Sequence, residues 1–328
     1  MATSGSWDYT RSAAQIIAAS LEDLGVLIPG GTIVSAHETM ALSRLNMIVK
    51  QYQGASDGSP GISVITRQRV TLLLAKGQHT YLVGPASSDA RASTQVGRTT
   101  IRTAEAIGQP ALDITATTDT TTYPGTTITM TASDFIGIEQ DDGTIFWSTI
   151  SSTGAGPVVT IGAGLDVAAA AGNYVWWFTS RAQRFPEIES AVLRNSDYKD
   201  TPLEIYTEAA QYDQGVVDKY ADGQPTAILV EPLRIATRVT LNSQPTDVTD
   251  TIVLTVLYPA EDYDATSNDI AFPQEALRFL KWELSFELAP GFGVPWTPAM
   301  DKARNEARAM YLNLNPENSV LYFQPGGL

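Results

Sequence analysis

The chain has 328 residues, no cysteine and a formal net charge of −15 at pH 7. The missing thiols exclude disulfides and thiolate metal sites, and the surplus of acidic residues argues against nucleic-acid binding through phosphate neutralisation, which needs lysine and arginine. The N-terminal stretch "MATSGSWDYTRSAAQ" lacks the basic and apolar regions of a signal peptide, and the most apolar segment is too short to span a bilayer, so we expect no membrane association.

Two amphipathic helices are predicted near the N-terminus. The first covers about 11–24, with Thr10 as its N-cap. The second begins at Ser35, because Ser35 and Glu38 have the spacing of a capping box, and it ends at Gly54. Apolar side chains recur every three or four residues in both helices, so each helix needs a partner to cover its apolar face.

The chain changes character at the glycine- and serine-rich segment 54–61. The residues that follow alternate in hydrophobicity and predict two strands, joined as a hairpin by a turn at Lys76-Gly77. A second group of strand-like runs, with one or two short helices among them, lies nearer the C-terminus. We expect 61–89 and 181–269 to form one mixed, β-rich region.

Residues 90–180 are predicted to form a β-sandwich-like or barrel-like domain, inserted as a unit. Short runs of alternating apolar residues are separated by turns in this segment. Asp142-Gly143, between two such runs, indicates a hairpin. Side chains alternate in direction along a strand, so one of the adjacent Trp176 and Trp177 is expected to face outward, where it could contact a sugar or a protein.

Two further amphipathic helices are predicted near the C-terminus. One runs from Pro273, near its first position, to Ala289, where a Pro-Gly pair is expected to stop it. The other has Thr297 as its N-cap, with a proline at the first helical position, and ends at Asn315. Both carry an apolar stripe, and neither has an obvious partner close to it in the sequence.

The fold class that follows is α+β. The simplest way to bury four apolar stripes is a helical bundle made of 1–60 and 270–315, from which the β-rich region is looped out. The tail 316–328 is predicted to be a docking arm that binds another protein chain, because it contains a continuous apolar run; the alternative is that it folds back onto its own helices. The residues of this run are Val320, Leu321, Tyr322 and Phe323.

No catalytic, cofactor or metal motif stands out. His37 and His79 occur without a serine nucleophile elbow, and structural or solvated roles are favoured for both. An acidic loop at 261–269 has oxygen ligands suited to Ca²⁺ but lacks the glycine and the distal glutamate of an EF-hand, so a solvated loop is favoured. Asp141 and Asp142 are interpreted as turn residues rather than a glycosidase pair. The acidic residues of the loop are Glu261, Asp262, Asp264 and Asp269.

A resemblance to a known family rests on the order of several stretches. These are "AAQIIAASLEDLGVL", "SAHETMALSRLNMIVKQYQ", "LLLAKGQHTYLVGP", "PEIESAVLR", "TPLEIYTEAAQYDQ", "LTVLYPAED" and "FPQEALRFLKWELSFELAPGFGVPWTPAMDKARNEARAMY". In this order they resemble the head-to-tail adaptor (tail accessory or head-completion) proteins of tailed bacteriophages, most closely those of short-tailed phages. The segment 90–180 departs from the short form of this family as an extra β insertion.

The resemblance implies a structural virion protein without enzymatic activity or cofactor. Its copies would assemble in the host cytoplasm and form a dodecameric ring at the head-to-tail interface, between the portal protein and the tail or nozzle protein. Genomic DNA would pass through the channel during ejection without specific binding, and a negatively charged lumen would help it slide. The alternative is a β-rich tail protein that binds a receptor or a carbohydrate, and a glycan hydrolase ranks third.

Overall fold

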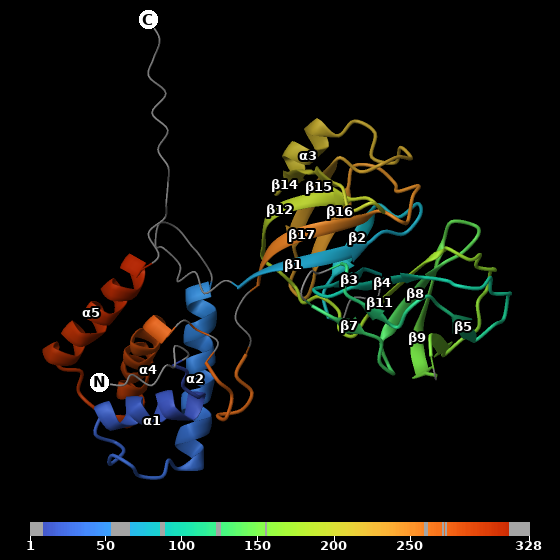
Figure 1. Cartoon of the computed structure of the whole chain (residues 1–328). Coiled ribbons are helices and arrows are strands. Elements are labelled where there is room, and N and C mark those ends of the chain that lie inside the picture. Colours follow the sequence, from blue (N-terminus) through green and yellow to red (C-terminus); the bar gives the residue numbers. More distant parts are fainter. Residues whose placement is uncertain are drawn as a thin grey trace, which may run out of the picture. The chain divides into compact units, whose positions relative to one another are not determined.

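The computed structural model shows a chain that divides into two compact units (Figure 1). A helical unit combines Met1–Thr66 with Pro259–Leu328, and a contiguous β unit covers Arg67–Tyr258. The predicted α+β class is therefore confirmed, with both ends of the chain in the helical unit. The structure describes residues 9–53, 66–85, 89–122, 126–154, 156–258, 262–270, 272 and 274–314.

The four predicted helices pack together in the helical unit. The helix α4 contacts α1, α2 and α5, and α1 also contacts α2 (Figure 1). Buried side chains from all four helices form a single core, in which Leu45 and Leu284 are fully enclosed and Tyr311 comes from α5. The elements are α1 (Ala13–Asp23), α2 (Ser35–Gln53), the 3-10 turn η1 (Gln274–Ala276), α4 (Leu277–Phe292) and α5 (Pro298–Leu314).

The starts of α1 and α5 show how side chains cap these helices. In α1 the N-cap is Ser12 rather than the predicted Thr10. The Ser12 hydroxyl accepts a bond from the Gln15 N–H at 3.4 Å, and the Gln15 side chain accepts one from the Ser12 N–H at 3.2 Å. This is a capping box, two residues further along than expected. The predicted cap of α5 is confirmed, since the Thr297 hydroxyl accepts from the Met300 N–H at 3.3 Å.

Two other helix ends differ from the prediction. Ser35 is already the first helical residue of α2, and the carbonyl of Val34 accepts the N–H groups of the first turn, so Ser35 is not the N-cap. The helix α4 does not stop at Ala289 but continues through Pro290. Proline is tolerated there because only the last turn follows, and the left-handed Gly293, at φ 64°, then ends the helix.

The segments that flank the predicted insertion 90–180 form a β-sandwich, together with β3 (Arg91–Ser93), which lies inside the predicted insertion but pairs with β1. Its five-stranded sheet has the order β13-β12-β17-β1-β3, and its four-stranded sheet has the order β14-β15-β16-β2. Leu72, Ile228 and Leu254 are among the side chains from both sheets that fill a shared core. The elements are β1 (Thr66–Leu73), β2 (Thr80–Val83), β3 (Arg91–Ser93), β12 (Glu187–Arg194), β13 (Asp200–Pro202), β14 (Glu204–Tyr206), α3 (Ala209–Gly215), β15 (Ala227–Pro232), β16 (Thr237–Leu241) and β17 (Thr251–Tyr258).

The predicted hairpin at Lys76-Gly77 is wrong. The turn exists, with Gly77 at φ 74°, but β1 belongs to the five-stranded sheet and β2 to the four-stranded sheet, so the turn carries the chain across the sandwich. The Tyr81 hydroxyl holds this turn, donating to the Gln78 carbonyl at 2.9 Å and accepting from the Ala75 N–H at 3.0 Å. Two alternating strands and a glycine turn have the same local pattern whether the strands pair or face each other.

The inserted segment forms a six-stranded sheet, curved into a half-barrel that is called the barrel below, with the order β4-β11-β8-β9-β10-β5. Its edge strands meet at an antiparallel bridge between Ile101 and Ile114, where the Thr115 N–H donates to the Thr100 carbonyl at 2.8 Å. The strands are β4 (Gly97–Thr100), β5 (Ala111–Asp113), β8 (Phe135–Glu139), β9 (Ile145–Thr153), β10 (Val158–Ile161) and β11 (Tyr174–Phe178), with a separate pair of β6 (Thr118–Asp119) and β7 (Ile128–Thr129).

The predicted hairpin at Asp142-Gly143 is confirmed. It joins β8 to β9, whose register begins with Glu139 opposite Ile145, and Gly143 has φ 78°. A left-handed glycine is what a tight turn between two twisted strands requires. Whether 90–180 folds independently of the sandwich stays a prediction.

Candidate functional site

The acidic loop is tied to the helical unit by its own side chains. The Asp262 carboxylate pairs with Lys50 of α2 at 2.7 Å, and both side chains are exposed. Asp264 accepts a hydrogen bond from the Asn268 side chain at 2.7 Å, within the loop. Glu261 lies outside the described residues. These two carboxylates therefore bind different partners and do not point to a common ligand.

The remaining acidic residue of this loop takes part in backbone pairing. Asp269 forms an antiparallel bridge with Ser12, and the Ile270 N–H donates to the Arg11 carbonyl at 2.9 Å. The loop thus fastens the start of α1 to the segment that leads into α4. Across the described part of the chain, no group of three or more histidine and acidic side chains is arranged to hold a metal ion. The loop is best described as a structural tie.

The two histidines lie in different units of the molecule. The His37 ring meets Phe292 edge to face, with 4.8 Å between centroids, inside the helical unit. The His79 ring meets Tyr220 in a similar way at 4.9 Å, inside the β unit. Each histidine thus packs against one aromatic ring.

The acidic pair at the tip of the β8–β9 hairpin stabilises the turn. Asp141 accepts from the Asn173 side chain at 3.0 Å and from the Ala170 N–H at 2.8 Å. Asp142 accepts from both the hydroxyl and the N–H of Thr144, and these bonds, the hydroxyl first, lower the pKa of Asp142. Their contacts match the interpretation of both residues as turn residues.

The adjacent tryptophans of β11 point to opposite faces, as a strand requires, but neither is exposed. Trp177 is 0% exposed in the barrel core, and Trp176 is 2% exposed in a second cluster with Leu73 and Phe178. The expected outward platform is therefore wrong, because Trp176 packs against Leu73 of β1, Val96 and neighbouring aromatic rings. The Trp177 ring packs so closely on β4 that a Cβ at Gly97 would lie 2.3 Å from it, so this position requires glycine.

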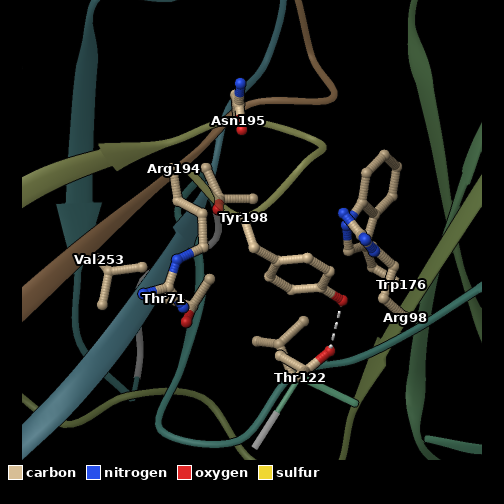
Figure 2. Close-up of a pocket in the computed structure, with 10 residues that line it drawn as sticks. Thr71, Arg98, Thr122, Trp176, Arg194, Asn195, Tyr198 and Val253 are labelled. Carbon is tan, nitrogen blue, oxygen red and sulfur yellow. Dashed lines mark hydrogen bonds between the residues drawn. The ribbon is translucent and has the colours of Figure 1, made fainter. Parts of the chain in front are cut away.

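A small cavity lies where the barrel meets the sandwich (Figure 2). Its volume of about 30 Å³ has room for little more than a water molecule or two. Arg98 from β4 and Tyr198 from the turn after β12 face each other here, with the guanidinium 4.1 Å from the ring centroid. The lining residues are Thr71, Val96, Arg98, Thr122, Trp176, Arg194, Asn195, Tyr198, Thr251 and Val253.

The contacts of this cavity join the two parts of the β unit rather than bind a ligand. Tyr198 has the left-handed φ of 62°, and its hydroxyl lies 3.2 Å from that of Thr122, as Figure 2 shows. Arg98 also covers the Tyr174 ring at 4.9 Å and donates to the Ser196 carbonyl at 3.0 Å. Cation–π contacts on two rings fix the guanidinium. We describe this group as the Arg98 clamp.

A buried carboxylate supports the Arg98 clamp from the barrel side. Burial raises the pKa of Asp119, but hydrogen bonds from the Thr122 hydroxyl, from the Thr121 N–H and from the Arg98 N–H at 2.9 Å outweigh it, so the pKa lies below its usual range. The carboxylate therefore stays charged at neutral pH and anchors the loop that carries Thr122.

A larger hollow on the β unit was not predicted from the sequence. It has a volume of about 390 Å³ and contains two arginines, Arg91 and Arg181, that stand far apart in the chain. Only the fold brings them together, so no local motif marked them. The lining residues are Arg91, Phe135, Trp147, Ser148, Thr149, Gly162, Ala163 and Arg181.

No protein-family model matches this chain, and no curated protein matches it. Within the described ranges, no helix is long and apolar enough to cross a membrane. The predicted docking residues Val320, Leu321, Tyr322 and Phe323 lie outside the described residues, so the docking arm stays a prediction.

Proposed function

We propose that this protein is a structural head-to-tail adaptor of a tailed bacteriophage, whose copies form a ring between the portal and the tail. The observation that carries the proposal is the helical unit, in which α1 and α2 pack with α4 and α5 from the other end of the chain. This packing was predicted from the four apolar stripes, and the helices of both ends lie in stretches that resemble the adaptor family. The β unit is looped out of it as one contiguous segment.

Exposed apolar side chains on the helical unit support assembly with neighbouring molecules. Ile28 is 81% exposed, and four other large apolar side chains of this unit are also exposed. Contact with a neighbouring copy at these positions would remove apolar surface from water. The other four are Tyr9, Val34, Met47 and Met310.

The charge of the chain fits a DNA channel. A net charge of −15 per copy is multiplied around a ring. A lumen with this sign repels phosphates and lets DNA move without sticking. The receptor- or carbohydrate-binding alternative had Trp176 or Trp177 as its platform, and both side chains are buried.

The proposal is tested by imaging the purified protein with and without its cognate portal protein. Negative-stain images and native mass spectrometry should show rings that bind the portal end-on. Ile28→Ser should weaken ring formation, because it removes exposed apolar surface from the helical unit. Val217→Ser is the matched control, since Val217 is 97% exposed but lies on the β unit.

The docking arm adds a second test of the same proposal. Truncation after Glu317 should leave the protein folded, judged by circular dichroism, while weakening its binding to the portal. A protein that stays monomeric with excess portal, or that binds glycans instead, contradicts the adaptor proposal. Equal portal binding by truncated and full-length protein contradicts the docking arm alone.

A further inference from the structure

The barrel and the sandwich are joined by two chain crossings that lie side by side. The chain enters the barrel between β3 and β4 and leaves it between β11 and β12. The N–H of Ala182, in the second crossing, donates to the carbonyl of Ala92, just before the first crossing, at 2.7 Å. Two crossings at one place can act as a hinge, so other contacts must fix the angle between the barrel and the sandwich.

One such contact lies at the opposite end of β8 from the crossings. Phe135, at the start of β8, pairs with Phe178, where the chain leaves the barrel, whereas the hairpin tip after Glu139 contacts the sandwich. At this tip the Lys76 ammonium donates to the Asp142 carbonyl at 3.1 Å. This hydrogen bond is exposed, and such a bond contributes little net stability. The Arg98 clamp, with its contacts to two rings and a carbonyl, is therefore the stronger tie.

The sandwich contributes a strained residue, Tyr198, to the Arg98 clamp. Its φ of 62° lies in the left-handed region, which favours glycine and disfavours a bulky side chain. The turn itself holds this shape, because the Tyr198 N–H donates to the Asn195 carbonyl at 3.0 Å and the Asn195 N–H donates to the Lys199 carbonyl at 3.1 Å. Glycine would satisfy this turn without strain, so what tyrosine adds is its side chain, which reaches the barrel (Figure 2).

We propose that Tyr198 is a releasable stop, which holds the barrel in one orientation on the sandwich. Its ring centroid lies 4.1 Å from the Arg98 guanidinium, and its hydroxyl lies 3.2 Å from that of Thr122. Relaxation of the Tyr198 backbone withdraws the ring, so relief of strain offsets part of the contacts that are lost. The cavity of about 30 Å³ beside the ring leaves this contact incompletely packed. Once the ring has left, the barrel pivots about the two crossings.

The test measures the distance between the barrel and the sandwich in the full-length protein. The chain has no cysteine, so Ile107→Cys on the barrel and Val217→Cys on the sandwich provide two sites for spin labels, at positions that are 68% and 97% exposed. Double electron–electron resonance should give one narrow distance distribution when Tyr198 is present. Tyr198→Gly suits the left-handed turn and removes the ring, and it should broaden this distribution at least about twofold.

Ser133→Gly is the matched control. Ser133 is the other non-glycine residue with a positive φ in the described part of the chain, at 77°, and it is an exposed residue of the barrel. Glycine relieves the backbone strain there without changing the Arg98 clamp, so the distance distribution should stay narrow. Arg98→Gln removes the cation from the barrel side and should broaden the distribution as Tyr198→Gly does. This second variant provides the test if the glycine variant fails to fold.

Fluorotryptophan NMR with a soluble paramagnetic reagent gives an independent reading. Trp176 packs against Leu73 of the sandwich, whereas Trp177 lies in the barrel core. Release of the stop should therefore raise the relaxation rate of the Trp176 signal at least about twofold in the Tyr198→Gly protein and leave that of Trp177 unchanged. The stop is contradicted if both clamp variants keep the narrow distribution, or if Ser133→Gly broadens it equally. This inference does not depend on the adaptor proposal.

Discussion

The helical unit and the β unit are stabilised in different ways. The helical unit has one core, and its helices come from both ends of the chain. The β unit is contiguous, and its sandwich and barrel have separate main cores, joined by an aromatic cluster around Trp176 and Phe178. Losing either end of the chain should therefore disrupt the helical unit while leaving every strand of the β unit in place.

The buried polar groups also differ between the units. In the helical unit, Glu283 of α4 is 3% exposed and forms a two-pronged ion pair with Arg304 of α5, at 3.0 and 2.6 Å. In the β unit, buried Tyr81 and Asp250 have displaced pKa values. At neutral pH, substitutions in the core or in the buried ion pair of the helical unit should therefore lower the stability of that unit alone. A change of pH should instead alter the stability of the β unit.

The largest effect is expected from Leu45→Ala in α2. Leu45 is fully buried in the helical core, so its truncation leaves a cavity and should cost about 3–5 kcal/mol. Met47→Ala, at an exposed position of the same helix, should change the free energy of unfolding by less than about 0.5 kcal/mol. Fluorotryptophan NMR during urea unfolding can report each unit through its own tryptophans.

The tryptophan signals show whether the two units unfold separately. Trp282 and Trp296 belong to the helical unit and lie edge to face, 6.4 Å between centroids. Their signals should unfold at lower urea in the Leu45→Ala protein, while those of Trp176 and Trp177 stay unchanged. If all four signals shift together, the two units unfold as one and the comparison fails.

The next effect in size is expected from Arg304→Ala. This change leaves the Glu283 carboxylate buried without its partner, and breaking a buried pair from one side costs about 3 kcal/mol or more. Arg304 also covers the Phe286 ring at 3.7 Å, so packing is lost as well. The control is Lys302→Ala, which breaks only an exposed pair with Glu306. Equal losses of stability in both variants would show that the buried pair contributes no more to stability than the exposed pair does.

The sequence predicted the helical unit better than the sandwich, for a physical reason. The apolar stripe of a helix such as α2 repeats within one short stretch of sequence, so the apolar face can be recognised from that stretch alone. Strand pairing depends on residues that are far apart in the sequence. The turn between β1 and β2 shows that a glycine turn does not reveal whether the two strands it joins pair with each other. The Arg91–Arg181 hollow was missed because its residues come from separate segments of the chain and share no local spacing.

A smaller, pH-dependent effect is expected from Tyr81→Phe in the β unit. Burial raises the pKa of Tyr81 to about 12, above the ordinary value of 10.0. Between these values the unfolded state loses its proton first, so stability should fall as pH rises through this window. The variant removes the contribution of Tyr81 to this slope, and it costs about 1–2 kcal/mol at neutral pH because the turn at Gly77 loses the Tyr81 bonds.

Alkaline urea titrations of the Tyr81→Phe protein provide the measurement. Tyr258, with a pKa also raised by burial to about 12, should keep part of the slope in this variant. Tyr220→Phe, at an exposed position, should leave both the slope and the stability unchanged. A wild-type protein whose stability is flat above pH 10 would contradict the pKa shift of Tyr81.

The smallest effect, and the only one expected to stabilise, is that of Asp250→Asn. Asp250 is buried beside Gln224, whose side chain donates to it at 3.1 Å. Burial raises its pKa, and the nearby charge of Asp247 raises it further, so the charged form is disfavoured in the folded state. At neutral pH the folded protein bears the cost of that charge, and the cost is relieved as pH falls through the raised pKa. Asparagine removes the charge and keeps an acceptor for Gln224, so the gain should be less than about 1 kcal/mol at pH 7 and should vanish below about pH 4.

Asp222→Asn, at an exposed position of the same unit, should change the stability at neither pH. Urea unfolding of both variants across this pH range tests the prediction. A gain in stability that persists in acid cannot come from the charge of Asp250.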